Sequence, residues 1–146
     1  TCRGCVPRQL DHVSRVLTTW LWRWAPVVAA MAAIFFVAGQ TSAGDLPGGL
    51  SNYTGHFIAY GGLAALALRG FAAASWRGVT GRSAVLAVLL SAGYGVTDEL
   101  HQRFVPNRFP GVDDWAFDLL GSILGVCAVL LLARLVRAAR ERTRDV

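Results

Sequence analysis

The sequence contains no lysine, only one methionine and few charged side chains, and its three cysteines are too few for a disulfide framework. Charged residues make up 16% of the 146 residues, against ~25% in soluble globular proteins, whereas 54% are hydrophobic. This balance argues against a water-soluble enzyme. Cys2 and Cys5 resemble half of a zinc site, but no second such pair follows, and Cys127 is expected to be a small buried side chain. The chain begins at Thr1 rather than at methionine, so the sequence leaves open whether residues precede it.

All of the positive charge comes from arginine. Fourteen arginines outnumber nine acidic residues, which gives a formal net charge of +5. The arginines form short clusters between apolar stretches and do not make one continuous basic patch. We therefore expect anionic lipid headgroups, and not nucleic acid, to be the partner of this charge.

Four apolar stretches indicate four helices embedded in a membrane. Their expected bounds are residues 20–39, 53–70, 83–102 and 114–135, followed by a basic cytoplasmic tail at 134–146. A helix needs roughly 20 residues to span a bilayer, and about 17 suffice at the lower limit, so the second and third stretches span it only with their polar ends included. The sequence predicts an all-α fold, an integral membrane four-helix bundle that forms one domain over residues 1–146.

The first apolar stretch also allows a second interpretation. A basic segment, an apolar core and the small residues of Gly39–Gly44 resemble a secretory signal peptide with its cleavage site. The segment ahead of the apolar core is long for a signal peptide, so we favour a membrane-spanning helix. The other three stretches are expected to be in the membrane in either case.

The distribution of arginine predicts the orientation of the bundle. Twelve of the fourteen arginines lie in the N-terminal segment, around the connection after the second stretch, or in the C-terminal tail. Because cytoplasmic segments carry an excess of Lys and Arg, both termini are predicted to be cytoplasmic. The polar start of the second helix, the end of the third and the start of the fourth then meet at the outer face.

Polar side chains recur at helical spacing on the second and third helices. His56 and Tyr60 are one turn apart on the second helix. Two neighbouring faces of the third helix carry Gly95, Glu99 and Gln102 on one and Tyr94, Asp98 and His101 on the other. Because the two faces point in different directions, they cannot both face lipid.

The fourth helix carries two acids on the same face as two glycines. Asp114, Asp118, Gly121 and Gly125 follow one another at intervals of three or four residues. A GxxxG pair lets a neighbouring helix approach closely, which would turn both carboxylates into the bundle. A charged residue at the centre of a membrane helix costs about 2.5–3.5 kcal/mol, so such residues are functional candidates by default.

Simpler explanations for these residues stay open. His56 and Tyr60 are amphipathic side chains that also occur at membrane interfaces. One member of the pair Asp98–Glu99 is expected to be a solvated helix end, and either Asp113 or Asp114 could simply complement the helix dipole. Asp118 is harder to explain in this way, because it lies one turn inside an apolar helix.

Four segments of the sequence carry a family resemblance. They are Gly55–Leu63 (GHFIAYGGL), Ser91–Gln102 (SAGYGVTDELHQ), Phe104–Arg108 (FVPNR) and Asp114–Gly121 (DWAFDLLG). Together these segments resemble the VanZ-like family of small bacterial membrane proteins. The family pattern has a histidine and an aromatic residue at a helix start, a YGxxxExxQ helix end, an arginine in the next loop, and an acid followed four residues later by Asp or Asn. The resemblance covers residues 55–125, about half the chain.

The resemblance implies a multi-pass protein of the bacterial cytoplasmic membrane. The founding member of the family is associated with low-level resistance to the glycopeptide teicoplanin, and the resemblance supplies no mechanism. Two positions depart from the family pattern. Tyr53–Gly55 stands where the family often has Lys or Asp before its histidine, and Asp118 stands where many members have Asn.

We expect the polar residues to form an outward-facing binding pocket. Its predicted members are His56, Tyr60, Tyr94, Asp98, Glu99, Gln102, Arg108, Asp114 and Asp118. Arg108 would bind a phosphate or carboxylate of a lipid headgroup or of a lipid-linked cell-wall component, although it could also serve only to neutralise one of the acids. Membrane lipids are the expected partners, no cofactor or resident metal is assigned, and association into a homo-oligomer stays open.

Two other functions stay open. The cluster could belong to an intramembrane hydrolase or transferase, whose carboxylates and imidazole act as acid and base or hold a divalent cation. That function is less favoured, because the sequence has no nucleophile motif, phosphate loop or HExxH. A transport component is also less favoured, because the polar residues stop at the outer leaflet.

Overall fold

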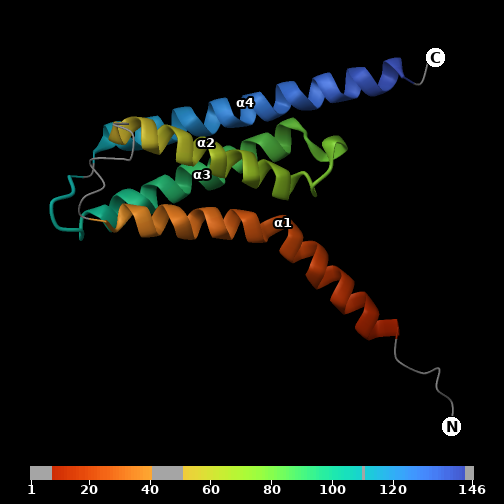
Figure 1. Ribbon diagram of the computed structural model, residues 1–146, viewed down its shortest axis with the longest axis horizontal. Coiled ribbons are helices and arrows are strands. Elements are labelled where there is room, and N and C mark those ends of the chain that lie inside the picture. Colours follow the sequence, from red (N-terminus) through yellow and green to blue (C-terminus); the bar gives the residue numbers. More distant parts are fainter. Residues whose placement is uncertain (1–7, 41–50, 110, 144–146) are drawn as a thin grey trace, which may run out of the picture.

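The computed structural model describes residues 8–40, 51–109 and 111–143, with side chains from residue 13 onward in the first of these ranges. Within these residues the chain forms four long α-helices that run alternately in opposite directions (Figure 1). They are α1 (Arg8–Ala38), α2 (Asn52–Phe71), α3 (Gly81–Gln102) and α4 (Val112–Arg142), with a short 3-10 helix at Trp76–Gly78. The predicted all-α fold is confirmed, and so is the continuation of the third helix to Gln102.

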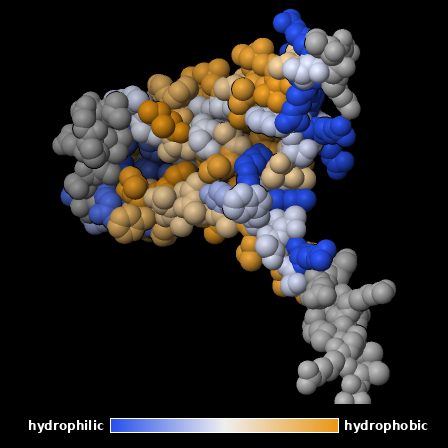
Figure 2. Space-filling view, turned by 45° about the vertical axis from the view of Figure 1, so that its right-hand side comes forward, coloured by the Kyte–Doolittle hydropathy of each residue, from blue (hydrophilic) through white to orange (hydrophobic). Residues whose placement is uncertain are grey.

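The exterior of the bundle is suited to lipid. Three segments are long and apolar enough to cross a membrane by length and composition, namely Val13–Ala38, Gly81–Gln102 and Val112–Arg142. Large apolar side chains such as Phe36, Leu89 and Leu131 point outward. Figure 2 shows a largely apolar surface along the bundle, with hydrophilic side chains gathered at the end where α4 finishes. These features indicate a multi-pass membrane protein. α2 packs on all three of the other helices, antiparallel to α1 and α3 and parallel to α4.

Local capping sets where two of the helices begin. The hydroxyl of Ser51 accepts a hydrogen bond of 3.2 Å from the backbone N–H of Thr54, which starts α2 at Asn52. At the start of α3, Thr80 and Ser83 form a reciprocal capping box. The cap at Ser51 fixes the start of α2, one turn before His56.

Small residues hold α2 and α4 close together. A Cβ atom added to Gly121 would overlap the backbone carbonyl of Phe57, and one added to Gly125 would overlap that of Gly61. The GxxxG prediction is confirmed in this respect. The half of the bundle away from the polar end is filled by apolar side chains, including Ala64, Ala67, Ala87 and Val126 from three helices. Backbone contact at the glycines leaves no space for lipid between α2 and α4.

A proline bends α1 away from the bundle. Pro26 lies inside the helix, and Figure 1 shows the N-terminal part of α1 leaning outward from the other three helices. Proline has no N–H to donate to the carbonyl four residues earlier, which is that of Trp22. Arg69 of α2 donates to this carbonyl at 3.0 Å, and its guanidinium lies 5.3 Å from the centre of the Trp22 ring. Arg69 thus satisfies the acceptor that Pro26 leaves free.

Three details differ from the sequence predictions. α1 begins at Arg8 and not near residue 20, because the polar segment ahead of the apolar stretch contains no helix breaker. The basic segment from residue 134 is helical to Arg142 and is not a separate tail, because Arg137 binds the carbonyl oxygens of Trp76 and Val79 and holds it to the α2–α3 connection. Cys127 is exposed on the outer side of α4 and is not buried, because the buried face runs through Ser122 and Val126.

Candidate functional site

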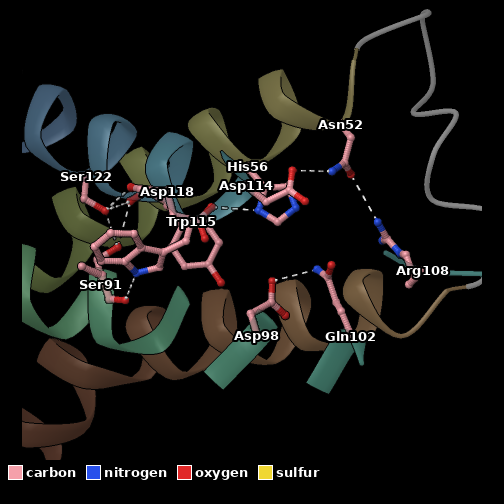
Figure 3. A network of polar contacts seen from close by, with 12 residues as sticks. Asn52, His56, Ser91, Asp98, Gln102, Arg108, Asp114, Trp115, Asp118 and Ser122 are labelled. Atoms are coloured by element: carbon pink, nitrogen blue, oxygen red, sulfur yellow. Dashed lines mark hydrogen bonds and ion pairs between the residues drawn. The ribbon is translucent and has the colours of Figure 1, made fainter. Parts of the chain in front are cut away.

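Polar side chains meet where α2 begins, α3 ends and α4 begins (Figure 3). Asp98, Glu99, Asp114 and Asp118 lie at this end of the bundle with His56, His101, Arg108 and several amide or hydroxyl side chains. Among them, His56, Asp98, Gln102, Asp114 and Asp118 are buried. Burial of this many polar groups in an apolar bundle is costly unless they have partners.

His56 and Asp118 form the central pair. The Nδ1 atom of His56 lies 2.8 Å from Oδ1 of Asp118, with 8% and 0% of the two side chains exposed. The pair joins α2 to α4 just beyond the glycine contact. A buried carboxylate that hydrogen-bonds an imidazole fixes the orientation of the ring and favours one tautomer.

A second chain of contacts runs along the rim of the site. The side-chain amide of Asn52 donates to Oδ1 of Asp114 at 2.9 Å, and Nη1 of Arg108 donates to Oδ1 of Asn52 at 3.2 Å. Within the described ranges Arg108 makes no ion pair. The sequence left open that Arg108 pairs directly with an acid. It does not, because Asn52 lies between Arg108 and Asp114.

The two polar faces of α3 point to two different helices. Tyr94 donates to the backbone oxygen of Met31 at 2.7 Å, and His101 stacks on Phe35 at 4.2 Å between ring centres, so one face lies against α1. On the other face, Gly95 lies against Asp118 of α4. The expectation that the two faces cannot both point at lipid is confirmed.

The prediction that Asp98 or Glu99 is a solvated helix end is wrong. Asp98 is 4% exposed, and its Oδ2 accepts a hydrogen bond of 3.3 Å from Gln102. Both carboxylate oxygens of Glu99 are buried as well. The third helix ends only after Gln102, which leaves both acids about one turn inside it. Asp98 lines the cavity with residues of α1 and α2, and Glu99 lies beside His56 of α2 and Asp118 of α4.

Hydrogen bonds from serine and tryptophan side chains connect the helices next to the His56–Asp118 pair. Ser122 of α4 donates to the backbone oxygen of Asp118 at 2.7 Å and lies 2.8 Å from the hydroxyl of Ser91. Ser91 in turn donates to the backbone oxygen of Tyr60 at 3.1 Å, and the indole of Trp115 donates to the oxygen of Ala92. These contacts connect α2, α3 and α4 directly below the His56–Asp118 pair.

A cavity of about 270 Å³ opens beside these groups. Its apolar wall comes from α1, and its polar wall comes from α2, α3 and the loop before α4. It is lined by Ala33, Ile34, Val37, Ala38, Asn52, Gly55, His56, Ala59, Tyr60, Asp98, Gln102 and Arg108. The cavity thus has one side suited to hydrocarbon and one side suited to a polar group.

Several buried polar atoms at the site have no hydrogen-bond partner within the described part of the chain. They are the Tyr60 hydroxyl, Oδ1 of Asp98, both oxygens of Glu99, Nε2 of His101, Nε of Arg108 and Oδ2 of Asp118. Most buried polar groups in proteins are hydrogen-bonded, so a concentration of such atoms in one place requires an explanation.

The sequence was compared with known proteins. It matches the family described as VanZ/LLP1 over residues 53–134, more than half of the chain. The chain belongs to the VanZ/LLP1 family. No curated protein and no solved structure matched.

The part that matches VanZ/LLP1 runs from the second residue of α2 to near the end of α4, so it contains every residue of the predicted pocket. The structure brings eight of the nine together at the polar end. Tyr94 is the exception, because it lies further from the end of α3 and its hydroxyl contacts α1. Its ring centre is 6.4 Å from that of Tyr60.

Four residues of the polar network were missed in the sequence. They are Asn52, Ser91, Trp115 and Ser122. A signal for three of them was present, because Asn52 precedes His56 by one turn, Ser91 precedes Gly95 by one turn and Ser122 follows Asp118 by one turn. Trp115 follows Asp114 directly and has no comparable signal, since its contact depends on how α3 and α4 cross.

Proposed function

We propose that this protein binds the polar headgroup of a membrane lipid or of a lipid-linked cell-wall component in the cavity between α1 and the ends of α2 and α3. The observation that carries the proposal is the two-sided lining of the cavity, with Ile34 and Val37 on one side and His56, Gln102 and Arg108 on the other. Small-molecule sites have volumes of ~300–1,000 Å³. A volume near 270 Å³ suits a headgroup whose acyl or prenyl chains stay in the bilayer.

Arg108 is the anion-binding group in this proposal. One nitrogen of its guanidinium already contacts Asn52, and its Nε is buried without a partner in the described residues. A guanidinium binds phosphate or carboxylate through parallel hydrogen bonds. Arg108 can therefore donate hydrogen bonds to the phosphate of a headgroup while Asn52 holds the guanidinium in place.

The acceptors at the cavity favour a headgroup that also carries donors. The Asp98 carboxylate accepts from Gln102 and faces the Tyr60 hydroxyl, and its remaining acceptor positions would suit a donor on the headgroup. An anion alone would be repelled by Asp98. A headgroup with a phosphate and with hydroxyl or ammonium groups matches both Arg108 and Asp98.

We place the protein in the bacterial cytoplasmic membrane, with both termini inside and the polar end facing out. Twelve of its fourteen arginines then lie on the cytoplasmic side. A lipid-linked cell-wall component held at the outer face would be less available to a glycopeptide. That sequestration is the route we propose to resistance against teicoplanin.

The test is lipid binding by purified protein, measured by native mass spectrometry. Phosphatidylethanolamine and a polyprenyl-diphosphate-linked sugar are expected to bind better than phosphatidylcholine, which has no headgroup donors. Arg108→Ala should weaken binding about tenfold or more, because hydrogen bonds to charged groups contribute ~1.5–3 kcal/mol. Arg103→Ala is the matched control, since Arg103 is exposed at the end of α3 in the same connection. Equal binding by the two variants would contradict the proposal.

An intramembrane hydrolase or transferase is the second candidate function. The observation that favours it is the 2.8 Å contact between His56 and Asp118 at the edge of the cavity, because a carboxylate-oriented imidazole is suited to act as a general base. Release of headgroup or phosphate from the bound lipid tests it. Turnover by the parent protein that is lost in His56→Gln would support catalysis, and the absence of turnover with tightly bound lipids would exclude it for those lipids.

A further inference from the structure

Three side chains from three different helices meet at one point beside the cavity. They are His56 of α2, Glu99 of α3 and Asp118 of α4, and each offers one ligand atom within 4.8 Å of the other two. We propose that these three residues hold a divalent transition-metal ion of the zinc type. The proposal is independent of whether the neighbouring cavity binds a lipid.

The strongest support is a fully buried carboxylate oxygen without a partner. Asp118 is 0% exposed, and its Oδ2 has no hydrogen bond to any residue that the structure describes. This oxygen lies against Gly95, one turn before Glu99 on α3. Both oxygens of Glu99 are also buried and without partners. Three buried acceptors that face one another are costly without a cation or protons between them.

The charges around the point also favour a cation. Glu99 interacts electrostatically with Asp98, Asp114 and Asp118, and His56 interacts with the same three aspartates. Arg108 acts on Asp98, but its hydrogen bond goes to the neutral Asn52. A divalent ion would balance the carboxylates that Arg108 does not neutralise.

The types of ligand select the class of metal. Calcium prefers six to eight oxygen ligands, and magnesium keeps several waters in an octahedral shell. An imidazole nitrogen with two carboxylate oxygens suits zinc, which in catalytic sites takes three protein ligands and leaves a fourth position open. His56 also lines the cavity, so an ion here would lie at the edge of the cavity.

Binding requires a small rearrangement of the central pair. His56 Nδ1 and Asp118 Oδ1 are 2.8 Å apart, which is a hydrogen-bond distance. Two ligand atoms on one tetrahedral zinc ion, each ~2.0–2.2 Å from the metal, stand about 3.4 Å apart. Zinc would therefore replace the proton between the two groups, so zinc binding is expected to release protons and to strengthen as pH rises.

The experiment measures zinc on the full chain, purified in detergent with a histidine-free tag and with Cys2 and Cys5 changed to Ser to remove other ligands. Metal analysis after dialysis is expected to find about one zinc ion per chain. Glu99→Gln is the main variant, because Glu99 makes no hydrogen bond in the described structure and the change therefore removes none. The affinity of Glu99→Gln for zinc should fall by more than the ~10–100-fold loss that is typical when a residue that only hydrogen-bonds to a metal ligand is removed. Asp113→Asn is the matched control, because Asp113 is an exposed acid in the first turn of α4.

The outcomes separate clearly. Retention of zinc by the parent and by Asp113→Asn, with loss in Glu99→Gln and Asp118→Asn, supports the site, and circular dichroism must show unchanged helix content in the variants. Absence of zinc in the parent, or equal affinity in the parent and Glu99→Gln, overturns it. Tighter binding of magnesium or calcium than of zinc overturns the assigned class of metal. The zinc measurement uses protein from which lipid has been removed, and the lipid-binding measurement is repeated on protein treated with a chelator, so each proposal can fail without the other.

Discussion

The imidazole of His56 is joined to the carboxylate of Asp118 at the point where α2 and α4 come closest. The two residues are 62 positions apart in the sequence, and their side chains are 2.8 Å apart. The next residue after His56 is Phe57, whose backbone lies against Gly121, less than one turn after Asp118. The packing of the bundle and the geometry of the site therefore depend on the same contact.

Substitution of Gly121 tests this dependence. Gly121→Ala places a methyl group against the backbone of Phe57, so the helices must separate. We expect a loss of about 1–3 kcal/mol, the usual cost of overpacking, seen as a lower unfolding temperature in detergent. Gly62→Ala on α2 is the control, because a Cβ there meets nothing within 4 Å and alanine favours a helix by up to ~1 kcal/mol. Equal effects of the two changes would contradict the close-packing account.

The contact between Arg69 and Trp22 should hold α1 against the bundle. Arg69→Ala removes the donor to the Trp22 carbonyl that Pro26 leaves free. Such a partly exposed hydrogen bond contributes about 1 kcal/mol, so its loss should make local opening of α1 easier. Amides of α1 should then exchange with deuterium roughly fivefold faster. Arg82→Ala serves as the control, since Arg82 is an exposed arginine on α3. No difference in exchange between the two variants would show that α1 is held by its other contacts, which are the apolar packing and the hydrogen bond from Tyr94 to Met31.

The orientation in the membrane can be tested with single cysteines. In a chain whose Cys2, Cys5 and Cys127 are changed to Ser, Asn107→Cys places a thiol in the loop before α4, and Thr143→Cys places one after α4. The arginine distribution predicts that a membrane-impermeant maleimide labels Asn107→Cys in intact cells and labels Thr143→Cys only after permeabilisation. The reverse pattern would invert the bundle and move the cavity to the cytoplasmic side.

Teicoplanin susceptibility links the site to envelope physiology. We expect a sensitive Gram-positive host that expresses the parent chain to survive higher teicoplanin concentrations than the same host with Glu99→Gln or Arg108→Ala. Arg103→Ala should protect like the parent, because Arg103 is exposed and lies outside the cavity lining. All variants must be compared at equal abundance in the membrane. Equal protection by every variant would show that resistance does not depend on the polar residues of the site.

Much of the site was predictable from the sequence, because helical periodicity determines which residues share a face. Asp114, Asp118 and Gly121 recur at that period, and all three are buried in the structure. The burial of both Asp98 and Glu99 was not predictable, because it depends on how the other three helices pack around the end of α3. Periodicity assigns a residue to a face but does not say which neighbouring helix covers that face.

The partners within the site were also beyond the reach of the sequence. The contact of His56 with Asp118, and not with Glu99, follows from the rotation of α2 against α4 at their glycine contact. In the same way, the position of Asn52 between Arg108 and Asp114 depends on the path of the loop before α4. Contacts of this kind are set by tertiary packing and leave no periodic signal.

The central claim is that the cavity holds a lipid headgroup, and photo-crosslinking in living cells tests it most directly. A photoreactive residue at Ile34, which lines the cavity, is compared with one at Leu89, which faces outward on α3. The account predicts that Ile34 captures lipids enriched in a phosphate headgroup with hydroxyl or ammonium donors, and that Arg108→Ala abolishes this enrichment. Capture of the same lipid mixture at Ile34 and Leu89, unchanged by Arg108→Ala, would contradict the account.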